Sequence, residues 1–555
     1  MGRKVIEVYC GANRIISSLG VDTPQNYNGV CSYTTNISRY GDNTPLCLIN
    51  RDSLDCSALE DCTFAEQLSI LALSDVVGRS GVSLESQSTL LILSTTKGNV
   101  ECLNSDFESS YLWKMADKIA NHFGCANKPL IVSNACISGV AAIVIGARLI
   151  RQGRYDSVYV LGVDVVSEFV VSGFNSFKSI SPTVCRPYDV SRDGLTLGEG
   201  CATLLLTNDR DLSDSKIVVT GGAMSDDANH ISGPSRSGDG LFYAIDSAIK
   251  QSGIEAGELG FVNTHGTGTS FNDQMESRAL DMAALRAVAC NSLKPYLGHT
   301  LGASGVIEAI LAIEQLRHNY VFGVKGYAQN GLPFELNVSA KHREMEVNHC
   351  LKTASGFGGT NAALVLSKEA ALKIKPNKDK GQISIVEAAH VEIKQQDDVP
   401  FSEYIRAEYR ALGEPNMKFF KMDNLSKLAY VASCRLLEGV NLPYPSSRIG
   451  VVLANRSSSL DTDIAHQQIV DQHLPEGSSP AVFVYTLANI MAAEIAIKHK
   501  LQGELSLFIY ADKNMEFIED YSAQLISNDV CDAVVCGWCE LLKDEYDAEL
   551  KILKK

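Results

Sequence analysis

Cys136 lies in the segment of this sequence that best suits a nucleophile. Residues 128–132 form an apolar run that predicts a strand, the next residues are small, and residues 137–152 predict a helix that is apolar on all sides. Cys136 therefore falls at the N-terminus of a buried helix, where free N–H groups and the helix dipole favour a thiolate. A cysteine among small residues is more often a packed core residue, so this interpretation depends on its partners.

Two loops that contain histidine supply those partners. His265 ends a short apolar run and is followed by Gly-Thr-Gly-Thr. The hydroxyl residues of that loop are Thr267 and Thr269. Lys294 and His299 lie in a second loop, before a predicted helix over residues 306–315. Either histidine alone is more often structural, but a thiol with two imidazoles indicates nucleophilic catalysis, and the glycines and hydroxyls suit an extended polar ligand.

A glycine-rich turn precedes the last apolar strand of this region. Residues 353–361 read Thr-Ala-Ser-Gly-Phe-Gly-Gly-Thr-Asn, and a strand is predicted directly after the turn. The glycines on both sides of Phe357 allow the backbone N–H at this position to point into a site.

These loops occur in the order typical of the β-ketoacyl synthases of the decarboxylating, elongating type, within the thiolase superfamily. Residues 3–368 resemble that family. Arg-Pro-Tyr-Asp at 186–189, Gly-Glu-Gly at 198–200 and the Asn-Asp…Glu pattern at 272–276 fall in the same order. The joint order is far more specific than any single motif.

The resemblance implies a role for each of these residues. Cys136 takes the acyl chain from a phosphopantetheine thioester, and the N–H groups of Cys136 and Phe357 bind the oxyanion. His265 and His299, as neutral imidazoles, stabilise the enolate formed when a malonyl thioester loses CO2. The supporting residues are Lys294 and Glu308. The implied substrate-binding residues are Thr267, Thr269, Phe357, which also resembles the family's gate, and Gly358.

The implied function is that of a 3-oxoacyl-[acyl-carrier-protein] synthase in fatty acid, polyketide or aryl-polyene-type synthesis. The expected partner is acyl carrier protein, which brings the phosphopantetheine, so no resident cofactor and no metal are expected. One alternative is a non-catalytic partner that sets the chain length of another ketosynthase, although the intact thiol, histidines and lysine argue against it. A thiolase that condenses coenzyme A esters without decarboxylation is a second alternative. It would use another cysteine as base, where this sequence has paired histidines.

The alternation of short apolar runs with amphipathic stretches predicts an α/β protein. The resemblance implies a thiolase-like fold of two similar halves, layered α-β-α-β-α, over residues 1–368, with halves of about 1–205 and 206–368. A lysine-rich linker is predicted over residues 369–382. Residues 383–555 repeat the order of apolar runs in residues 1–200 and are predicted to be a degenerate third half. Family members are usually homodimers, so we expect a homodimer in which this half packs against the catalytic domain or its dimer mate.

The third half is expected to be catalytically silent. On the repeat, Asp512 falls where Cys136 stands in the first copy, and the sequence ends before any histidine loop. A second departure from the family is Asn134, where many members have threonine; it is expected to change contacts of the acyl pocket and to leave the nucleophile intact.

A redox function for the C-terminal region is the competing interpretation. Cys536 and Cys539 form a Cys-Gly-Trp-Cys motif after a predicted strand and before a predicted helix, as in thioredoxin-like proteins. Too few residues follow to build that fold, and the repeat already accounts for the strand. A metal site with Cys531 as a third ligand lacks a suitably spaced fourth ligand.

The composition is that of an ordinary globular chain. Of the 555 residues, 45% are hydrophobic and 21% are charged, and the net charge of −16 argues against nucleic acid as a partner. No secretory signal is visible, and polar residues interrupt the most apolar window, residues 131–150, so no membrane span is expected. The 16 cysteines are scattered without framework spacing, which indicates a cytoplasmic location.

Overall fold

The computed structural model describes residues 6–40, 44–372, 383–396, 399–413, 416–472 and 478–555. Within these residues, sixteen strands form one continuous mixed sheet in the order β13-β11-β10-β15-β16-β9-β1-β8-β6-β4-β5-β19-β18-β20-β21-β17. This order contains the same five-stranded unit three times.

The first unit has the order β1-β8-β6-β4-β5. In this unit β8 pairs antiparallel with both β1 and β6. β4 pairs parallel with both β6 and β5. The strands are β1 (Tyr9–Ser17), β4 (Thr89–Ser94), β5 (Leu130–Val132), β6 (Ser157–Asp164) and β8 (Gly200–Thr207).

The second and third units repeat this order and these directions. The second unit is β9-β16-β15-β10-β11, and the third is β17-β21-β20-β18-β19. The second contains β9 (Ile217–Asp226), β10 (Phe261–Asn263), β11 (Ala289–Asn291), β15 (His349–Ser355) and β16 (Thr360–Lys368). The third contains β17 (Val386–Lys394), β18 (Ile449–Asn455), β19 (Leu505–Ile509), β20 (Ala533–Leu542) and β21 (Glu545–Lys554). The predicted pair of similar halves and the predicted repeat after them are both confirmed by this topology.

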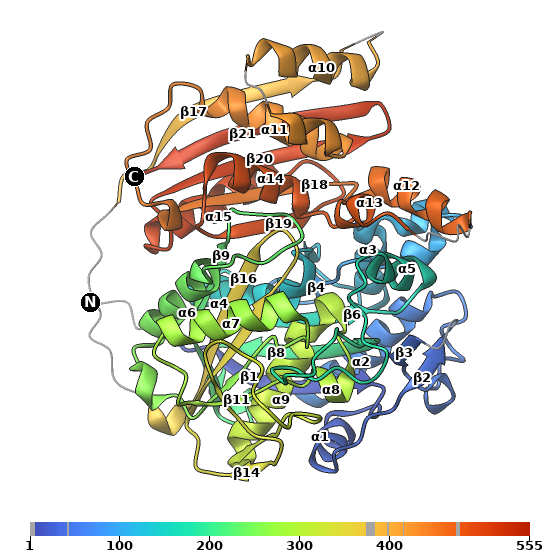
Figure 1. The fold of residues 1–555 in the computed structure, drawn as a ribbon, viewed down its shortest axis with the longest axis vertical. Helices are drawn as coiled ribbons and strands as arrows, with labels where there is room; N and C mark the ends of the chain where they lie inside the picture. The colour runs from blue at the N-terminus through green and yellow to red at the C-terminus, as the bar shows by residue number, and fades with distance from the viewer. Residues whose placement is uncertain (1–5, 41–43, 373–382, 397–398, 414–415, 473–477) are drawn as a thin grey trace.

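Helices cover the sheet in layers. The helices α4 (Ser138–Arg151) and α9 (Ser304–His318) pack on strands of both the first and the second unit, so they form the central layer. Outside them lie α2 (Phe64–Ser80) on the first unit, and α6 (Asp239–Ser252) with α7 (Ser270–Met282) on the second. The third unit carries α11 (Asn424–Leu437), α14 (Ile490–His499) and α15 (Met515–Ser527), and it lies above the other two in Figure 1. The first two units therefore have the thiolase-like α-β-α-β-α layering.

The two central helices contact each other through glycines at their N-terminal ends. A Cβ atom on Gly139 of α4 would lie 2.7 Å from the backbone nitrogen of Val306, and one on Gly305 of α9 would lie 2.3 Å from that of Val140. Only glycine permits this approach. It brings the loop before α4, which holds Cys136, next to the loop before α9, which holds His299.

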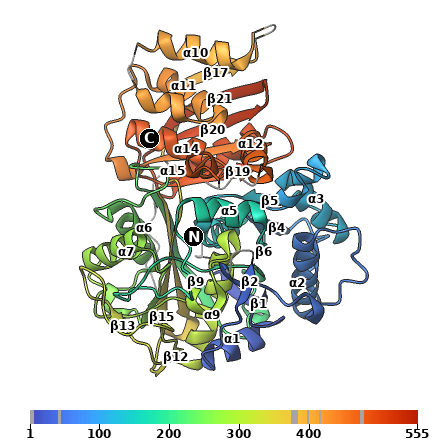
Figure 2. The ribbon, with the colours of Figure 1, turned by 45° about the vertical axis from the view of Figure 1, so that its right-hand side comes forward.

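The third unit joins the first along a sheet edge. β19 pairs antiparallel with β5, with Phe508 opposite Val132, and Figure 2 shows the two strands at the boundary of the C-terminal half. Asn134 extends this pairing beyond the strand, because its side chain donates to the carbonyl of Leu505 (3.0 Å) and accepts from the N–H of Leu507 (2.8 Å). The asparagine in place of the usual threonine is thus a contact with the third unit. The predicted packing of the extra half on the catalytic domain is also observed.

Buried ion pairs also connect the third unit to the first. Lys97 pairs with Asp463 at 3.1 Å, and both side chains are nearly inaccessible. Arg148 of α4 binds Glu504 with two hydrogen bonds of 2.8 Å and also donates to the hydroxyl of Tyr521. Polar groups buried in this way must stay paired. The pairing therefore makes the position of the third unit against the first specific.

The redox interpretation of the C-terminal region rested on a helix that does not form. β20 runs through both cysteines and turns into β21, which pairs with it along its whole length. Because side chains alternate along a strand, Cys536 and Cys539 point to opposite faces and pack into different cores. The apolar run from Ala533 to Trp538 continues as a strand because β21 supplies a partner.

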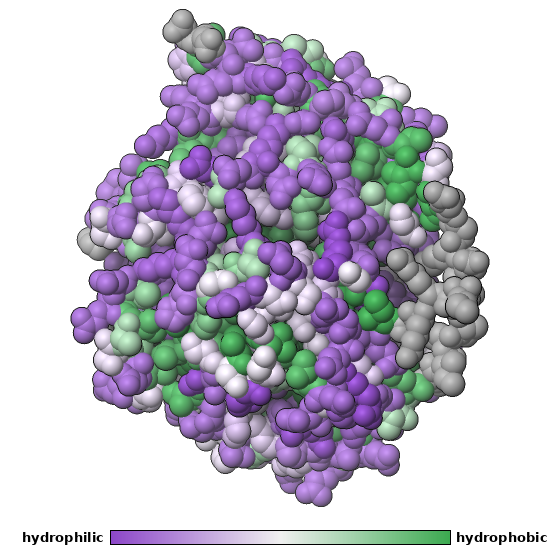
Figure 3. All heavy atoms as spheres, turned by 180° about the vertical axis from the view of Figure 1, so that it is seen from behind, coloured by the Kyte–Doolittle hydropathy of each residue, from purple (hydrophilic) through white to green (hydrophobic). Residues whose placement is uncertain are grey.

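Two further predictions concern the linker and membrane spans. Residues 373–382 of the predicted linker lie outside the described residues; β16 ends at Lys368 and β17 begins at Val386. No helix among the described residues is long and apolar enough to cross a membrane. Hydrophilic residues dominate the face seen in Figure 3, and apolar residues form small separate groups there.

Candidate active site

Cys136 is presented by a strained turn between β5 and α4. Ala135 has φ +47°, a left-handed conformation that costs a residue with a side chain about 1–3 kcal/mol. The turn is held by Ser138, whose hydroxyl accepts from the N–H of Asn134 (2.8 Å) and donates to the carbonyl of Ala135 (2.6 Å). The backbone is therefore forced to project Cys136 at the end of the central helix.

The structure brings the three predicted catalytic side chains together. The Cys136 sulfur and one ring nitrogen each of His265 and His299 all lie within 4.8 Å of one another. The imidazole centroids are 5.1 Å apart with the rings at 83°. Cys136 follows β5 of the first unit, whereas His265, after β10, and His299, before α9, belong to the second unit.

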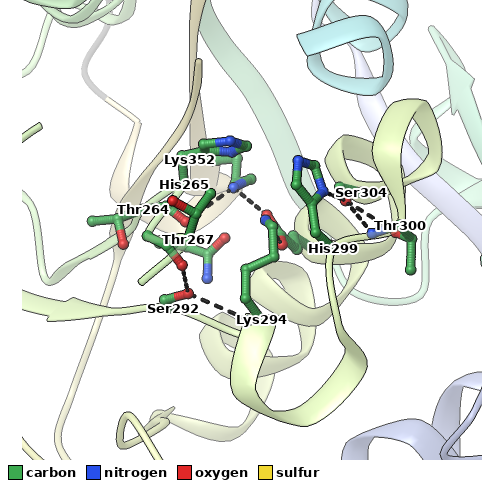
Figure 4. Close-up of polar contacts among 12 residues, drawn as sticks. Thr264, His265, Thr267, Ser292, Lys294, His299, Thr300, Ser304 and Lys352 are labelled. Carbon is green, nitrogen blue, oxygen red and sulfur yellow. Dashed lines mark hydrogen bonds and ion pairs between the residues drawn. The ribbon is translucent and has the colours of Figure 1, made fainter. Parts of the chain in front are cut away.

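The hydrogen bonds of His299 define its tautomer. The backbone N–H of Leu301 donates to Nδ1 at 3.2 Å, and the hydroxyl of Ser304 lies 3.0 Å from the same nitrogen (Figure 4). A backbone N–H can only donate, so Nδ1 is an acceptor and the neutral ring carries its proton on Nε2. The Nε2–H group is therefore free to donate into the site.

Glu276 of α7 fixes the loop that carries His265. Its carboxylate accepts from the N–H groups of His265 (2.7 Å) and Gly266 (2.9 Å), and it also accepts from the hydroxyls of Tyr188 and Thr353. The acidic residue that follows the histidine loop in the sequence is thus a support for that loop.

A buried cluster of charges lies next to the histidines. Glu308 pairs with Lys294, as expected, and with Lys352 at 2.5 Å, and all three side chains are almost fully buried. Figure 4 shows that Lys294 and Lys352 come from different elements of the chain. Two ammonium groups share one carboxylate, so the cluster carries net positive charge, which disfavours a metal cation among the thiol and the imidazoles.

Burial and these charges set the pKa values of the site. Burial, with the positive charge of Lys294, holds the pKa of both His265 and His299 well below the usual range, so both rings are neutral at neutral pH. Burial raises the pKa of Cys136 to about 12, and the ammonium of Lys294 opposes that shift. This differs from the expected thiolate: desolvation outweighs the favourable position at the helix N-terminus.

The site opens into a pocket of about 310 Å³. Cys136, both histidines, Thr267, Thr269 and Phe357 line it, together with the aromatic residues Phe174, Phe177 and Phe271. The remaining predicted residues do not line it. Lys294 and Glu308 lie behind the histidines, and Gly358 faces the third unit, where a Cβ atom would lie 2.6 Å from the side-chain nitrogen of Asn489.

Two supporting residues were missed in the sequence. Lys352 lies in β15, where polar and apolar residues are mixed, and this pattern gave no reason to choose it over a solvated lysine. Asp164 ends β6, and its carboxylate accepts from the N–H groups of Thr96, Lys97 and Gly302, which ties the first unit to the loop of His299. A carboxylate directly after a buried strand is the signal that could have identified it.

The fold and the site together define a class of protein: a thiolase-like scaffold with a Cys–His–His site at the junction of two similar units. Two family models match the chain, the N-terminal domain of β-ketoacyl synthase over residues 58–211 and its C-terminal domain over residues 217–326. This part of the chain is therefore similar to β-ketoacyl synthases over both of their domains.

Named relatives agree with this assignment. A 3-oxoacyl-[acyl-carrier-protein] synthase 2 from Vibrio cholerae is 32% identical over 264 residues, covering 44% of this chain and 63% of the relative. The tetracenomycin polyketide synthase ketoacyl synthase alpha subunit of Streptomyces glaucescens is 32% identical over 269 residues, covering 45% and 62%. The matched region therefore spans less than two thirds of the length of these relatives.

Solved structures show the same fold. A ketosynthase (ApeO) in complex with its chain length factor (ApeC) from Xenorhabdus doucetiae is 25% identical, with a TM-score of 0.60, and the match covers 66% of this chain and 99% of that one. A PfaC keto synthase–chain length factor covers all of this chain and 78% of its own, with a TM-score of 0.79 at 13% identity. The second likeness concerns the fold alone, and it includes the third unit.

Proposed function

We propose that this protein is a decarboxylating 3-oxoacyl-[acyl-carrier-protein] synthase, an acyltransferase of fatty acid, polyketide or aryl-polyene-type synthesis. The observation that carries the proposal is the convergence of the Cys136 sulfur and two neutral imidazoles within 4.8 Å in one pocket. Burial, together with the positive charges of Lys294 and Lys352, holds the pKa of both imidazoles well below the usual range and so keeps them neutral.

The first step is transfer of an acyl group from the thioester on the carrier protein to Cys136. The sulfur attacks the thioester carbonyl, a neutral imidazole nitrogen of His265 accepts the thiol proton, and that proton leaves with the thiol of the carrier. The N–H groups of Cys136 and Phe357 bind the oxyanion that forms on the carbonyl. The two donors are neighbours, because the residue before Phe357 lies against Cys136. A Cβ atom on Gly356 would lie 3.1 Å from the backbone nitrogen of Cys136.

The second step uses malonyl carrier protein. Loss of CO2 leaves an enolate whose oxygen accepts hydrogen bonds from imidazole N–H groups, including Nε2–H of His299. The enolate carbon attacks the acyl group on Cys136, the C–S bond breaks, and the sulfur takes up a proton from solvent. The product is a 3-oxoacyl thioester that is two carbons longer. The phosphopantetheine arrives with the substrate, and no step calls on a metal or resident cofactor.

Measurement of intact mass after exposure to acyl carrier protein loaded with acyl chains tests the proposal. We expect one acyl adduct in the wild type, none in Cys136→Ala, and longer product after addition of malonyl carrier protein. Absence of an adduct with every chain tested would refute the enzymatic function and favour the alternative, a partner that sets chain length for another ketosynthase. An adduct that resolves without malonyl carrier protein would favour the thiolase reaction.

The homodimer and the cytoplasmic location remain predictions. β5 is already paired with β19 of the same chain, so a second copy has to dock on another surface. Light scattering of the purified protein measures the oligomeric state.

A further inference from the structure

The turn that carries Phe357 is anchored on three sides. The N–H of Gly356 donates to the carbonyl of Thr360 (2.8 Å), that of Gly359 donates to the carbonyl of Gly356 (3.2 Å), and that of Gly358 donates to the carbonyl of Ile231 (2.6 Å). Among the hydrogen bonds of the described residues, none uses the N–H of Phe357. This N–H lies in the same peptide unit as the Gly356 carbonyl and points the opposite way, which leaves it free to donate to an oxyanion.

A further anchor comes from the third unit. Asn489, the fully buried residue before α14, donates from Nδ2 to the carbonyl of Phe357 at 2.9 Å. The peptide unit between Phe357 and Gly358 is thus bonded at both ends, by Asn489 on its carbonyl and by Ile231 on its N–H. Gly358 has φ +92° and no room for a side chain next to Asn489, so the approach of the two units is specific here.

The third unit also supports the ring of Phe357. Phe483 packs against Phe174 and Phe177, with centroids 5.4 and 6.3 Å away, and these two rings contact Phe357 at 6.2 and 5.4 Å. Phe483 occupies the space beside Gly173, where a Cβ atom would lie 2.1 Å from the ring. Both the backbone and the side chain of Phe357 are therefore held by contacts that reach into residues 478–555.

We propose that Asn489 is a positioning residue for acyl transfer, and that the third unit is in this way a working part of the active site. This inference rests on the proposed function. Asn489 fixes the peptide after Phe357, and this orients the Phe357 N–H toward the carbonyl under attack. Enolate formation, in contrast, depends on hydrogen bonds from the histidines.

The test compares two half-reactions in Asn489→Asp. Acylation of Cys136 is followed by intact mass, and decarboxylation of malonyl carrier protein is followed by CO2 release. Complete removal of an oxyanion donor costs about 10²–10³-fold, so a misaligned donor is expected to slow acylation by about 10–100-fold. Decarboxylation is expected to change by less than about twofold, because His265 and His299 keep their places.

Asn455 offers a matched control in the same unit. It is also a fully buried asparagine whose Nδ2 donates one bond to a backbone carbonyl, that of Ser458 (2.8 Å), and it makes no contact with the turn of Phe357. Asn455→Asp introduces the same charge and removes the same kind of bond, so both half-reactions are expected to stay near the wild-type rates.

The outcomes separate the inference from the function on which it rests. Unchanged acylation in Asn489→Asp, or an equal loss of both half-reactions in Asn489→Asp and Asn455→Asp, would overturn the inference. A wild type without any adduct would instead overturn the proposed function. If Asn489→Asp fails to fold, Asn489→Leu, which is similar in volume and uncharged, replaces it with the same expectations.

Discussion

The first and third units of this chain share one architecture and differ in their chemistry. The loop after β5 contains Cys136 in a pocket, and the loop after β19 places Asp512 at the corresponding position, where its side chain is 85% exposed. Ala135 adopts a left-handed conformation before Cys136, whereas Ala511 before Asp512 does not. A strand that leads into a helix is therefore insufficient to build a nucleophile.

What the third unit lacks is a second unit packed face to face with it. In residues 1–368 the imidazoles and the Phe357 turn come from the second unit, and they meet Cys136 because α4 and α9 pack together. The third unit instead meets the first unit edge to edge, through β19 and β5. The catalytic groups therefore meet only where the first and second units pack together. Four predictions test this conclusion.

The largest effect is expected from Glu308→Gln, which removes the charge shared by two lysines at the junction. Two buried ammonium groups then lose their carboxylate, and breaking a buried pair in this way costs about 3–5 kcal/mol of folding free energy. Condensing activity is also expected to be lost. Urea unfolding and malonyl-dependent product formation measure both quantities. Stability and activity equal to the wild type would show that the charge cluster is dispensable.

A smaller loss is expected from Lys97→Met at the edge-to-edge seam. Asp463 then loses its partner, and a cost of about 3 kcal/mol is expected, since burial already raises the pKa of this carboxyl and it can take up a proton. Because the sheet is continuous across the seam, thermal unfolding should shift as one transition. The double variant Lys97→Met/Asp463→Asn is expected to recover part of the loss. Two separate transitions would show that the third unit unfolds independently.

The pH dependence of stability tests whether His265 is held neutral at the junction. The pKa of His265 is far below the value of about 6.5 in the unfolded chain, so below pH 6.5 the unfolded chain binds more protons and stability falls with acidification. Each such histidine contributes up to about 1.4 kcal/mol per pH unit. His265→Gln is expected to remove about 1 kcal/mol of this dependence between about pH 6.5 and 5.5, and the slope difference approaches about 1.4 kcal/mol per pH unit only below that range.

The measurement is the difference between variant and wild type in urea unfolding at each pH. This difference is needed because burial raises the pKa of Asp164 to about 6 and that of Asp273 to about 7. Because the folded protein binds more protons than the unfolded chain at these carboxyl groups, they increase its stability as the pH falls through the same range. Parallel curves for wild type and variant would show that His265 is not held neutral.

The smallest effect is expected from Asp512→Cys in a Cys136→Ala background. The new thiol stands at the corresponding position of the third unit but has no imidazole partner, so no acyl adduct should form on exposure to acylated carrier protein. As Asp512 is exposed, stability should change by less than about 0.5 kcal/mol. An adduct at this position would show that a strand-to-helix turn alone activates a thiol.

The sequence allowed prediction of the parts of this site that have local patterns. The loops of Cys136, His265 and Phe357 each follow a strand and the loop of His299 precedes α9, as periodicity predicted, although the short helix Lys294–Leu297 lies within that last loop. Lys352 escaped prediction because a lysine in a strand of mixed polar and apolar residues carries no sign of the carboxylate it faces. The helix predicted after Cys539 was wrong because its strand is extended by pairing with β21, a partner that local sequence does not reveal.

The contacts between the repeats could not be predicted. The repeat itself was visible in the order of apolar runs, yet it does not specify which edges pair. Asn134 was interpreted as a pocket residue because its partner, the backbone of β19, lies far along the chain. Asn489 and Phe483 gave no signal for the same reason.

The pairing of β5 with β19 also has a consequence for biosynthesis. β5 comprises residues 130–132, and its partner strand leaves the ribosome only with residues 505–509. At about 5–20 residues per second, the hydrogen-bonding edge of β5 stays uncovered for tens of seconds in the nascent chain. An open edge invites pairing with other chains, so β5 is exposed to mispairing until the third unit has been synthesised.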